Sequence, residues 1–263
     1  MNILDKIIAD KFKEVELKKS IVPQSQLEKS ALFNRSIISL AENIKHSETG
    51  IIAEHKRRSP SKSVINQDQN VQDVVTGYAK AEASGISVLT DGKYFGGSLD
   101  DLLYARASVK TPILRKDFMI DEYQILEAKA YGADAILLIA AVLTKKQLEY
   151  FAKFAKDLGL DVLLEVHNRE ELEKSLRVKA DMIGVNNRNL KTFEVDIQNS
   201  KNLSPLIPSE FIKVSESGIS NIKAITDLRE YGYKGFLIGE NFMKTNDPAS
   251  AAIKFISELK SHK

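Results

Sequence analysis

Eight short apolar runs recur along the chain after residue 50, and each is followed by a segment with the amphipathic spacing of a helix. The runs begin near Ile51, Ile86, Pro112, Asp134, Asp161, Asp181, Phe211 and Lys234, with successive starts 35, 26, 22, 27, 20, 30 and 23 residues apart. Each interval fits one strand, one helix and two loops. Eight such units predict an α/β fold, a single (β/α)8 TIM barrel. From the pattern alone, an open doubly wound sheet is the alternative.

Residues 1–50 precede these units and are predicted to form a helical extension. Helical spacing relates Ile3, Leu4, Ile7, Ile8 and Phe12. Beyond Pro23, a second helical stretch is predicted to contain Leu32, Phe33, Ile37, Ile38 and Leu40. The 263 residues accommodate this extension and one barrel of roughly 200 residues, and no linker divides them. We therefore expect one domain over residues 1–263.

Helix-end signals support the units. Two capping boxes are predicted, at Thr144 with Gln147 and at Asn168 with Glu171, and Asp247 before Pro248 predicts a third helix start. Left-handed residues that end helices are predicted at Gly85, Gly132, Gly159 and Gly232.

Composition excludes several classes of protein. The absence of cysteine excludes a disulfide scaffold, a cysteine metal site and a thiol nucleophile, and a net charge of +2 argues against a nucleic-acid binder. The longest apolar run, Ala135 to Leu143, is too short to span a membrane, and an acidic N-terminus argues against a targeting peptide. The four histidines lack metal-ligand spacing, and no nucleotide-binding glycine motif occurs. We expect a cytoplasmic protein without metal, cofactor, nucleic-acid partner or membrane partner.

Polar residues interrupt the apolar strands at the ends where a barrel carries its chemistry. Because side chains alternate along a strand, each of these residues shares a face with an apolar neighbour, as Glu54 does with Ile52. They are Glu54, Lys56, Lys116, Glu165, Asn186 and Glu216. If these faces point inward, carboxylates and lysines converge at one mouth of the barrel. Close opposite charges and partial burial shift pKa values, which suits such a group to proton transfer.

Two small-residue segments predict an anion site. Ser217-Gly218 follows the seventh strand, before a helix expected near Ser220, and Gly239-Glu240 follows the eighth. Small residues let backbone N–H groups approach a phosphate, which in these barrels commonly lies after strands seven and eight. The basic cluster at residues 55–58, together with Lys62, is interpreted as part of a concave site for a small anion.

Seven ordered segments between residues 51 and 240 together resemble the indole-3-glycerol phosphate synthase family of tryptophan biosynthesis. They are IIAEHKRRSPSK from Ile51, LTDGKYFGGS from Leu89, LRKDF from Leu114, LLEVH from Leu163, GVNNRNL from Gly184, VSESGI from Val214 and GFLIGE from Gly235. The helical N-terminal extension is also similar to that of the family.

The resemblance implies a metal-free carbon–carbon lyase, a carboxy-lyase. It would convert 1-(2-carboxyphenylamino)-1-deoxyribulose 5-phosphate into indole-3-glycerol phosphate, carbon dioxide and water. Lys116 matches the family's general acid and Glu165 its proposed base, with Glu54 as a partner or second acid/base. Substrate-binding roles are implied for Lys56, Ser59, Pro60, Phe95, Phe118, Asn186, Arg188 and Glu216. Phosphate binding, mostly through backbone N–H groups, is implied for Ser217, Gly218, Gly239 and Glu240.

Two residues depart from the family pattern: Ser63 stands where glycine often follows, and Asn189 where aspartate is common. We expect both to affect loop motion and rate rather than the type of reaction. We also expect a monomer whose partner is an anionic sugar phosphate, with possible association with other tryptophan-pathway enzymes.

Three alternatives to this function stay open. A related barrel such as phosphoribosylanthranilate isomerase would share the phosphate site but lack the pairing of Glu54 and Lys56 with Lys116. A Schiff-base aldolase would use Lys116 as a covalent nucleophile. A non-catalytic phosphoanion-binding module would keep only the glycine loops.

Overall fold

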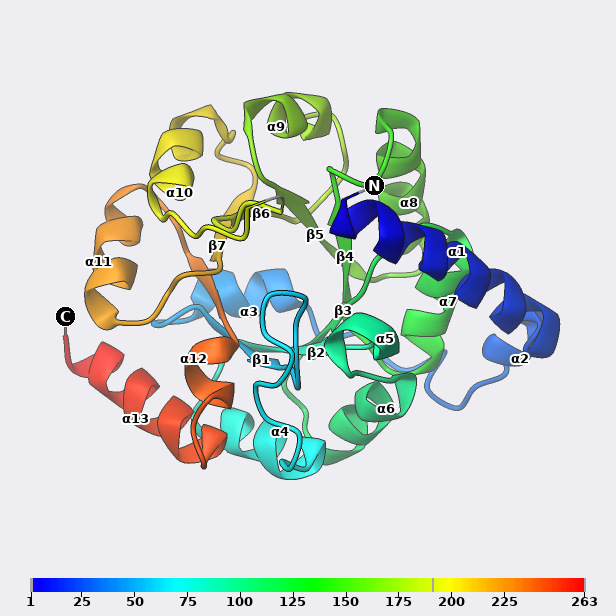
Figure 1. Cartoon of the computed structure of the whole chain (residues 1–263), viewed down its shortest axis with the longest axis horizontal. Coiled ribbons are helices and arrows are strands. Elements are labelled where there is room, and N and C mark those ends of the chain that lie inside the picture. The colour runs from blue at the N-terminus through cyan, green and yellow to red at the C-terminus, as the bar shows by residue number, and fades with distance from the viewer. Residues whose placement is uncertain (1, 191, 263) are drawn as a thin grey trace.

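A closed barrel of parallel strands forms the centre of the computed structural model, which describes residues 2–190 and 192–262 (Figure 1). Each strand pairs with the next along the chain, and the eighth closes on the first. The strands are β1 (Ile51–His55), β2 (Gly85–Leu89), β3 (Ile113–Lys116), β4 (Ala135–Ile139), β5 (Asp161–Val166), β6 (Met182–Asn186), β7 (Ile212–Glu216) and β8 (Gly235–Ile238). Every strand begins within one residue of its predicted start, and the barrel prediction is confirmed.

A ring of helices surrounds the barrel. After β1, the chain forms α4 (Val71–Lys80), α5 (Gly92–Phe95), α6 (Leu99–Ser108), α7 (Glu122–Ala130), α8 (Lys145–Asp157), α9 (Arg169–Ser175), α10 (Gln198–Leu203), the 3-10 helix η1 (Ser204–Leu206), α11 (Ile222–Glu230), α12 (Glu240–Met243) and α13 (Pro248–Ser261). Before the barrel lie α1 (Ile3–Ile21), α2 (Gln24–Leu27) and α3 (Leu40–His46). None of the helices within the described ranges is long and apolar enough to cross a membrane.

The two faces of each strand bury different cores. One core fills the barrel with the inward side chains Ile52, Leu114, Leu137, Leu163, Met182, Val214 and Leu237. The other lies between the strands and the surrounding helices. The inward faces are therefore those expected from the alternation of side chains along each strand. The polar side chains on the same faces also point toward the barrel axis: Glu54, Lys116, Glu165 and Glu216.

The N-terminal end of the barrel is closed by α3, which lies behind the strands in Figure 1. Leu40, Ala41 and Ile44 of this helix pack with the interior core. The Asp161 carboxylate at the start of β5 accepts hydrogen bonds from the Ser39 hydroxyl at 2.7 Å and the Ala41 N–H at 3.0 Å. Closure of this end leaves the opposite mouth, where the strands end, for chemistry.

The extension differs from its prediction in the second helical stretch. Leu32 and Phe33 lie in turns, Ile37 and Ile38 lie in irregular backbone, and the helix begins only at Leu40, capped by Ser39. Residues 36–38 instead lie beside the strand starts, where the Ile38 N–H donates to the Asp134 carboxylate at 2.9 Å. These apolar residues pack without being helical.

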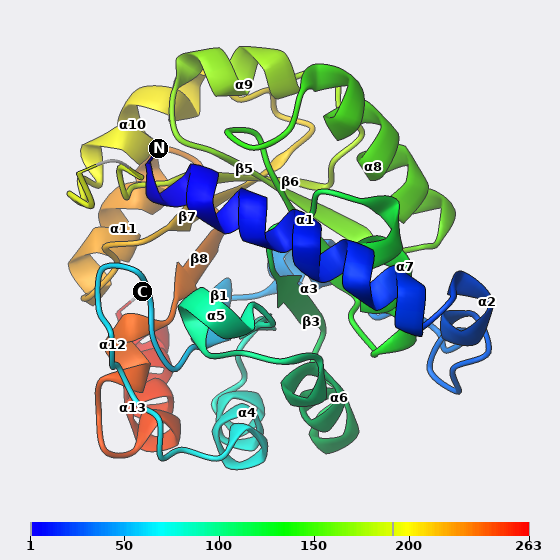
Figure 2. The same cartoon turned by 45° about the vertical axis from the view of Figure 1, so that its right-hand side comes forward.

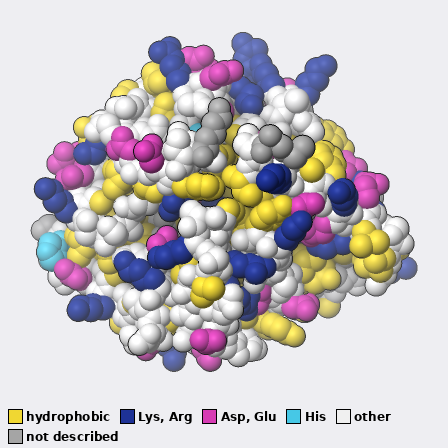
Figure 3. All heavy atoms as spheres, in the orientation of Figure 1, with side chains coloured by type: hydrophobic (Ala, Val, Ile, Leu, Met, Phe, Trp, Pro, Cys, Tyr) yellow, Lys and Arg dark blue, Asp and Glu magenta, His cyan; other side chains and the backbone are white. Residues whose placement is uncertain are grey.

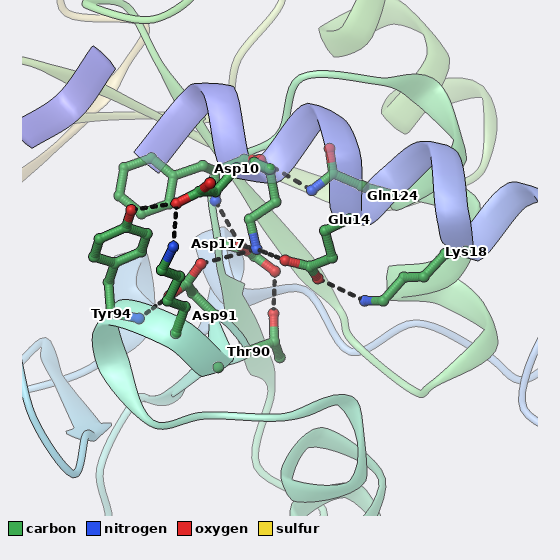
Figure 4. Close-up of polar contacts among 12 residues, drawn as sticks. Asp10, Glu14, Lys18, Thr90, Asp91, Tyr94, Asp117 and Gln124 are labelled. Atoms are coloured by element: carbon green, nitrogen blue, oxygen red, sulfur yellow. Dashed lines mark hydrogen bonds and ion pairs between the residues drawn. The ribbon is translucent and has the colours of Figure 1, made fainter. Parts of the chain in front are cut away.

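The first helix, α1, crosses the open mouth of the barrel, as the turned view shows (Figure 2). Its buried residues are Ile7, Lys11 and Val15, whereas Phe12, which shares the helical spacing of Ile8, is 52% exposed. The Lys11 ammonium lies 2.9 Å from Asp91, 3.0 Å from Asp117 and 2.8 Å from Glu14. Figure 4 shows these three carboxylates close together beside α1. The helix is thus held to the loops after β2 and β3 partly by buried charge, which an apolar pattern does not reveal.

Most helix-end predictions are confirmed. Thr144 and Gln147 form a capping box, and Asp247 caps α13 by accepting from the Ser250 N–H. Asn168 caps α9, but Glu171 accepts from the His167 N–H rather than completing a box.

One glycine prediction is wrong. Three of the four predicted helix-ending glycines, Gly132, Gly159 and Gly232, adopt positive φ. Gly85 instead begins β2, and the left-handed residue after α4 is Glu82, with φ 60°.

Candidate active site

A cavity of about 520 Å³ opens at the mouth where the strands end. Every predicted site residue lines it: Glu54, Lys56, Ser59, Pro60, Phe95, Lys116, Phe118, Glu165, Asn186, Arg188, Glu216, Ser217, Gly218, Gly239 and Glu240. Figure 3 faces this end of the molecule and shows Lys and Arg side chains around its centre, beside hydrophobic ones. The fold therefore gathers residues from seven strands and their loops into one concave surface.

A buried lysine between two carboxylates lies at the floor of the cavity. The Lys116 ammonium, at the end of β3, is 3.2 Å from Glu165 Oε2 and also contacts Glu216 Oε2. Glu165 and Glu216 lie near the ends of β5 and β7, and both are almost fully buried. Gly184 of β6 makes room for this cluster, since a Cβ there would lie 2.2 Å from Glu216 Oε1.

Burial and charge shift the pKa values of this cluster in opposite directions. Burial alone would lower the pKa of Lys116, but the surrounding carboxylates outweigh it and raise that pKa, so the ammonium is charged at neutral pH. Burial, reinforced by Glu165, raises the pKa of Glu216 to about 7 despite Lys116. Lys116 and His167 outweigh burial at Glu165 and lower the pKa of that carboxyl. The site thus holds one group that carries a proton and one carboxylate that is free to accept one.

A second ion pair lies beside the first. The Lys56 ammonium is 2.7 Å from Glu54 Oε1, and the Ser87 hydroxyl donates to Glu54 Oε2 at 3.3 Å. Burial would raise the pKa of Glu54, but Lys56 and Lys116 outweigh it and lower that pKa. Ser87 is a neighbour that the sequence-based prediction missed, although its place on the inward face of β2 was a signal that could have found it.

The loops after β7 and β8 also line the cavity. Ser217 and Gly218 both adopt positive φ, 67° and 79°, and a Cβ on Gly218 would lie 2.5 Å from a Val195 methyl. Gly239 precedes α12 and lies against Glu54, because a Cβ on Gly239 would lie 2.5 Å from Glu54 Oε1. The helix expected near Ser220 begins two residues later, at Ile222, after the cap residue Asn221.

Glu240 forms an ion-pair cluster at the rim. Its carboxylate lies 2.8 Å from the Lys62 ammonium and 3.9 Å from the Arg188 guanidinium. Arg188 also donates to the Phe193 carbonyl at 3.1 Å, and its N–H donates to Asn186 Oδ1 at 3.0 Å. The carboxylate holds two cations in place, so any contact with a phosphate here is left to the Glu240 backbone.

Apolar residues form a further wall. The Phe95 and Phe118 rings lie with centroids 5.9 Å apart. Ile3, Leu4 and Ile7 of α1 also line the cavity. Helical spacing predicted these three α1 residues to share a helix, but it carries no signal for the surface that the helix covers.

The basic cluster predicted to face a small anion divides in two. Lys56 lines the cavity, but Arg57 pairs with Asp101 at 2.6 Å and Arg58 donates to the Gly92 carbonyl at 2.6 Å, so neither lines the cavity. His55 is buried behind the strand, where desolvation lowers its pKa to about 4. Side chains alternate around this strand end, so consecutive basic residues point to different neighbours.

The family model for indole-3-glycerol phosphate synthase matches residues 4–255. This chain belongs to the indole-3-glycerol phosphate synthase family. An indole-3-glycerol phosphate synthase of Bacteroides thetaiotaomicron is 47% identical over 258 residues, covering 98% of this chain and 99% of the relative. One from Bordetella pertussis is 40% identical over 260 residues, covering 97% and 99%. As a member of the indole-3-glycerol phosphate synthase family, the chain is a carboxy-lyase of tryptophan biosynthesis, and the isomerase and binding-module alternatives are not supported.

Solved structures that resemble this chain support only its fold, because their sequence identity to it is low. KGPDC from Streptococcus mutans superposes with a TM-score of 0.60 at 13% identity, covering 81% of this chain and 98% of that one. A native KDPGal structure has a TM-score of 0.58 at 12% identity, covering 82% and 95%. Both support the barrel assignment.

Proposed function

We propose that the cavity binds 1-(2-carboxyphenylamino)-1-deoxyribulose 5-phosphate and that Lys116, Glu165 and Glu54 move the protons of its conversion to indole-3-glycerol phosphate. One observation carries this proposal: a charged lysine paired with carboxylates lines the same cavity as two aromatic rings and two small-residue loops. The substrate has three matching parts, namely a carbonyl to protonate, an aromatic ring and a phosphate.

Ring closure needs an acid at the ribulose carbonyl. Because neighbouring carboxylates keep Lys116 charged, it can donate a proton to the carbonyl oxygen as the aromatic carbon attacks. The new carbon–carbon bond forms at the ring carbon that carries the carboxylate. Loss of that group as carbon dioxide returns its bonding electrons to the ring.

Dehydration needs a base and an acid. Glu165, whose pKa is lowered, accepts the proton from the carbon next to the new alcohol. The hydroxyl leaves as water with a proton supplied from the same cluster, in which Glu54 is the second acid/base. Coupled carboxylates titrate as a set, so the division of labour belongs to the cluster as a whole.

Different walls of the cavity contact different parts of the substrate in this proposal. We propose that Phe95 and Phe118 enclose the aromatic ring and that Lys56 meets the substrate carboxylate, with Asn186 and Arg188 orienting the sugar. Ser59 and Pro60 shape the pocket, and Glu216 completes the polar network. Backbone N–H groups at Ser217, Gly218, Gly239 and Glu240 hold the phosphate, where small residues permit close approach.

Conversion is tested by incubating the protein with this substrate and following the fluorescence of the indole product. Lys116→Ala and Glu165→Gln are expected to lower kcat by roughly 10²–10⁴, the range for a positioned acid or base. Lys213→Ala is the matched control, because Lys213 lies at the opposite end of β7 and bonds to Ser204. Normal turnover by either site variant would contradict its role, and substrate-dependent labelling by borohydride would favour the Schiff-base alternative.

We propose that residues 1–263 act as one domain and one monomer in the cytoplasm, supported by the buried charge that joins α1 to the barrel. Light scattering during gel filtration tests the monomer. Association with other tryptophan-pathway enzymes is tested by repeating the measurement with those enzymes added.

A further inference from the structure

His167 follows β5 in one of the family-like segments but has no part in the mechanism above. Its side chain is 10% exposed and lies between two carboxylates. Nε2 is 3.3 Å from Glu165 Oε1, and Nδ1 is 3.1 Å from Glu171 Oε2. Within the described residues, the buried Nε2 makes no well-aligned hydrogen bond, so charge rather than hydrogen-bond geometry links it to Glu165.

Glu171 is held firmly enough to fix the ring. Its Oε2 also accepts from the His167 N–H at 2.8 Å, and its Oε1 accepts from Asn168 Nδ2 at 2.8 Å. The backbone carbonyl of His167 in turn accepts from Asn199 at 3.1 Å. The ring is therefore fixed through its own backbone and through α9.

Glu165 consequently has a basic group beside each oxygen: the Lys116 ammonium at Oε2, and the His167 ring, a cation when protonated, near Oε1. When Lys116 donates its proton during ring closure, it becomes neutral and its attraction for Glu165 falls. His167 does not take part in that transfer and remains beside the carboxylate.

We propose that His167, paired with Glu171, is a positioning residue that keeps Glu165 oriented and ionised after Lys116 has given up its proton. The inference rests on the base role proposed above for Glu165. It assigns a task to a pair of residues outside the cavity floor, at the stage when the base is needed.

The carboxylates around His167 favour the protonated form of its ring. Burial alone would lower the pKa of His167, but Glu171 and Glu165 outweigh it and raise that pKa, with a further contribution from Glu216 on β7. These carboxylates face the ring from α9, β5 and β7. A second cavity of about 740 Å³ is lined by His167 and Glu171, whereas Lys116 and Glu165 line the first cavity.

The test measures kcat from about pH 5 to 9 for wild type, His167→Gln and Glu171→Gln. Glu171→Gln removes the carboxylate charge and keeps the shape of the side chain. Both are expected to move the acid limb of kcat to higher pH by about one unit, since Glu165 becomes easier to protonate, and to leave KM unchanged. At the acid end, kcat falls about tenfold. His167→Lys, which restores a cation, moves the limb back toward wild type. His46→Gln is the matched control, because it breaks an exposed pair with Glu42 at 3.2 Å.

Double variants separate this inference from the proposed function. In a Glu165→Gln background, adding His167→Gln is expected to cost nothing further, because His167 acts through Glu165. An unmoved acid limb, an equal loss of kcat at every pH, or multiplied losses in the double variant would overturn the inference alone. Wild-type turnover by Glu165→Gln would overturn the base role and the inference together.

Discussion

Replacing Lys11 with methionine tests whether buried charge fastens α1 over the mouth of the barrel. The Lys11 side chain is 1% exposed, and its ammonium lies 2.8 to 3.0 Å from Glu14, Asp91 and Asp117. Methionine keeps most of the apolar length and removes the cation. Asp91 and Asp117, both almost fully buried, then lose a cationic partner.

The expected loss of stability is large. At 3 Å and an effective dielectric constant of about 20, each pair attracts by about 5 kcal/mol, much of which offsets the cost of burying the charges. Removing one partner leaves uncompensated buried charge, which typically costs about 3–5 kcal/mol. For a chain of this size, that corresponds to a fall in Tm of roughly 6–20 °C.

Urea and thermal unfolding of Lys11→Met measure this loss. Lys93→Met is the control: Lys93 is 67% exposed and pairs at 2.7 Å with Asp10 of α1, where solvent screening leaves little to lose. KM is also expected to rise in Lys11→Met, since Ile3 and Ile7 of α1 line the cavity. Equal unfolding midpoints for the two variants would refute the reasoning.

Two further predictions concern Glu216. Gly184→Ala would bring a Cβ within 2.2 Å of Glu216 Oε1, so we expect the Glu216 carboxylate to move away from Lys116. The expected results are at least a tenfold lower kcat and a free energy of unfolding lower by about 1–3 kcal/mol. Gly92→Ala is the control in the same assays, because the nearest atom to its Cβ would be 3.5 Å away. The raised pKa of Glu216, about 7 against 4.5, means that its contribution to stability is complete below about pH 4.5 and lost as pH rises through 7. Glu216→Gln cannot ionise, so its Tm relative to wild type should rise between about pH 4.5 and 7 and stay level above that range. A constant difference across this range would contradict the assignment.

The strands were predictable because their signals are local. A barrel strand buries both faces, so its apolar run is continuous, and a polar residue at its end stands out. The alternation of side chains along a strand then decides which of them point into the barrel. The strand pattern alone therefore predicts that four residues lie together: Glu54, Lys116, Glu165 and Glu216. The small residues after β7 and β8 could also be identified from the sequence.

Other features lacked a local signal. Ile37 and Ile38 have helical spacing but lie in irregular backbone, because contacts with the strand starts outweigh weak helix propensity. The sequence predicts that Arg57 and Arg58 belong to an anion-binding cluster. In the structure, Arg57 pairs with Asp101 and Arg58 donates to the Gly92 carbonyl. Each partner lies more than 30 residues away along the chain, beyond the reach of any local pattern.

The sequence by itself determined the eight-unit barrel, the inward polar faces and the family, since each is written in periodicity or in ordered motifs. Only the tertiary structure decided that α1 covers the mouth through the buried Lys11 and that His167 joins Glu171 to Glu165. The physical reason is that a charge is buried only where its partners converge on it. That convergence is a property of the closed barrel and not of any one segment.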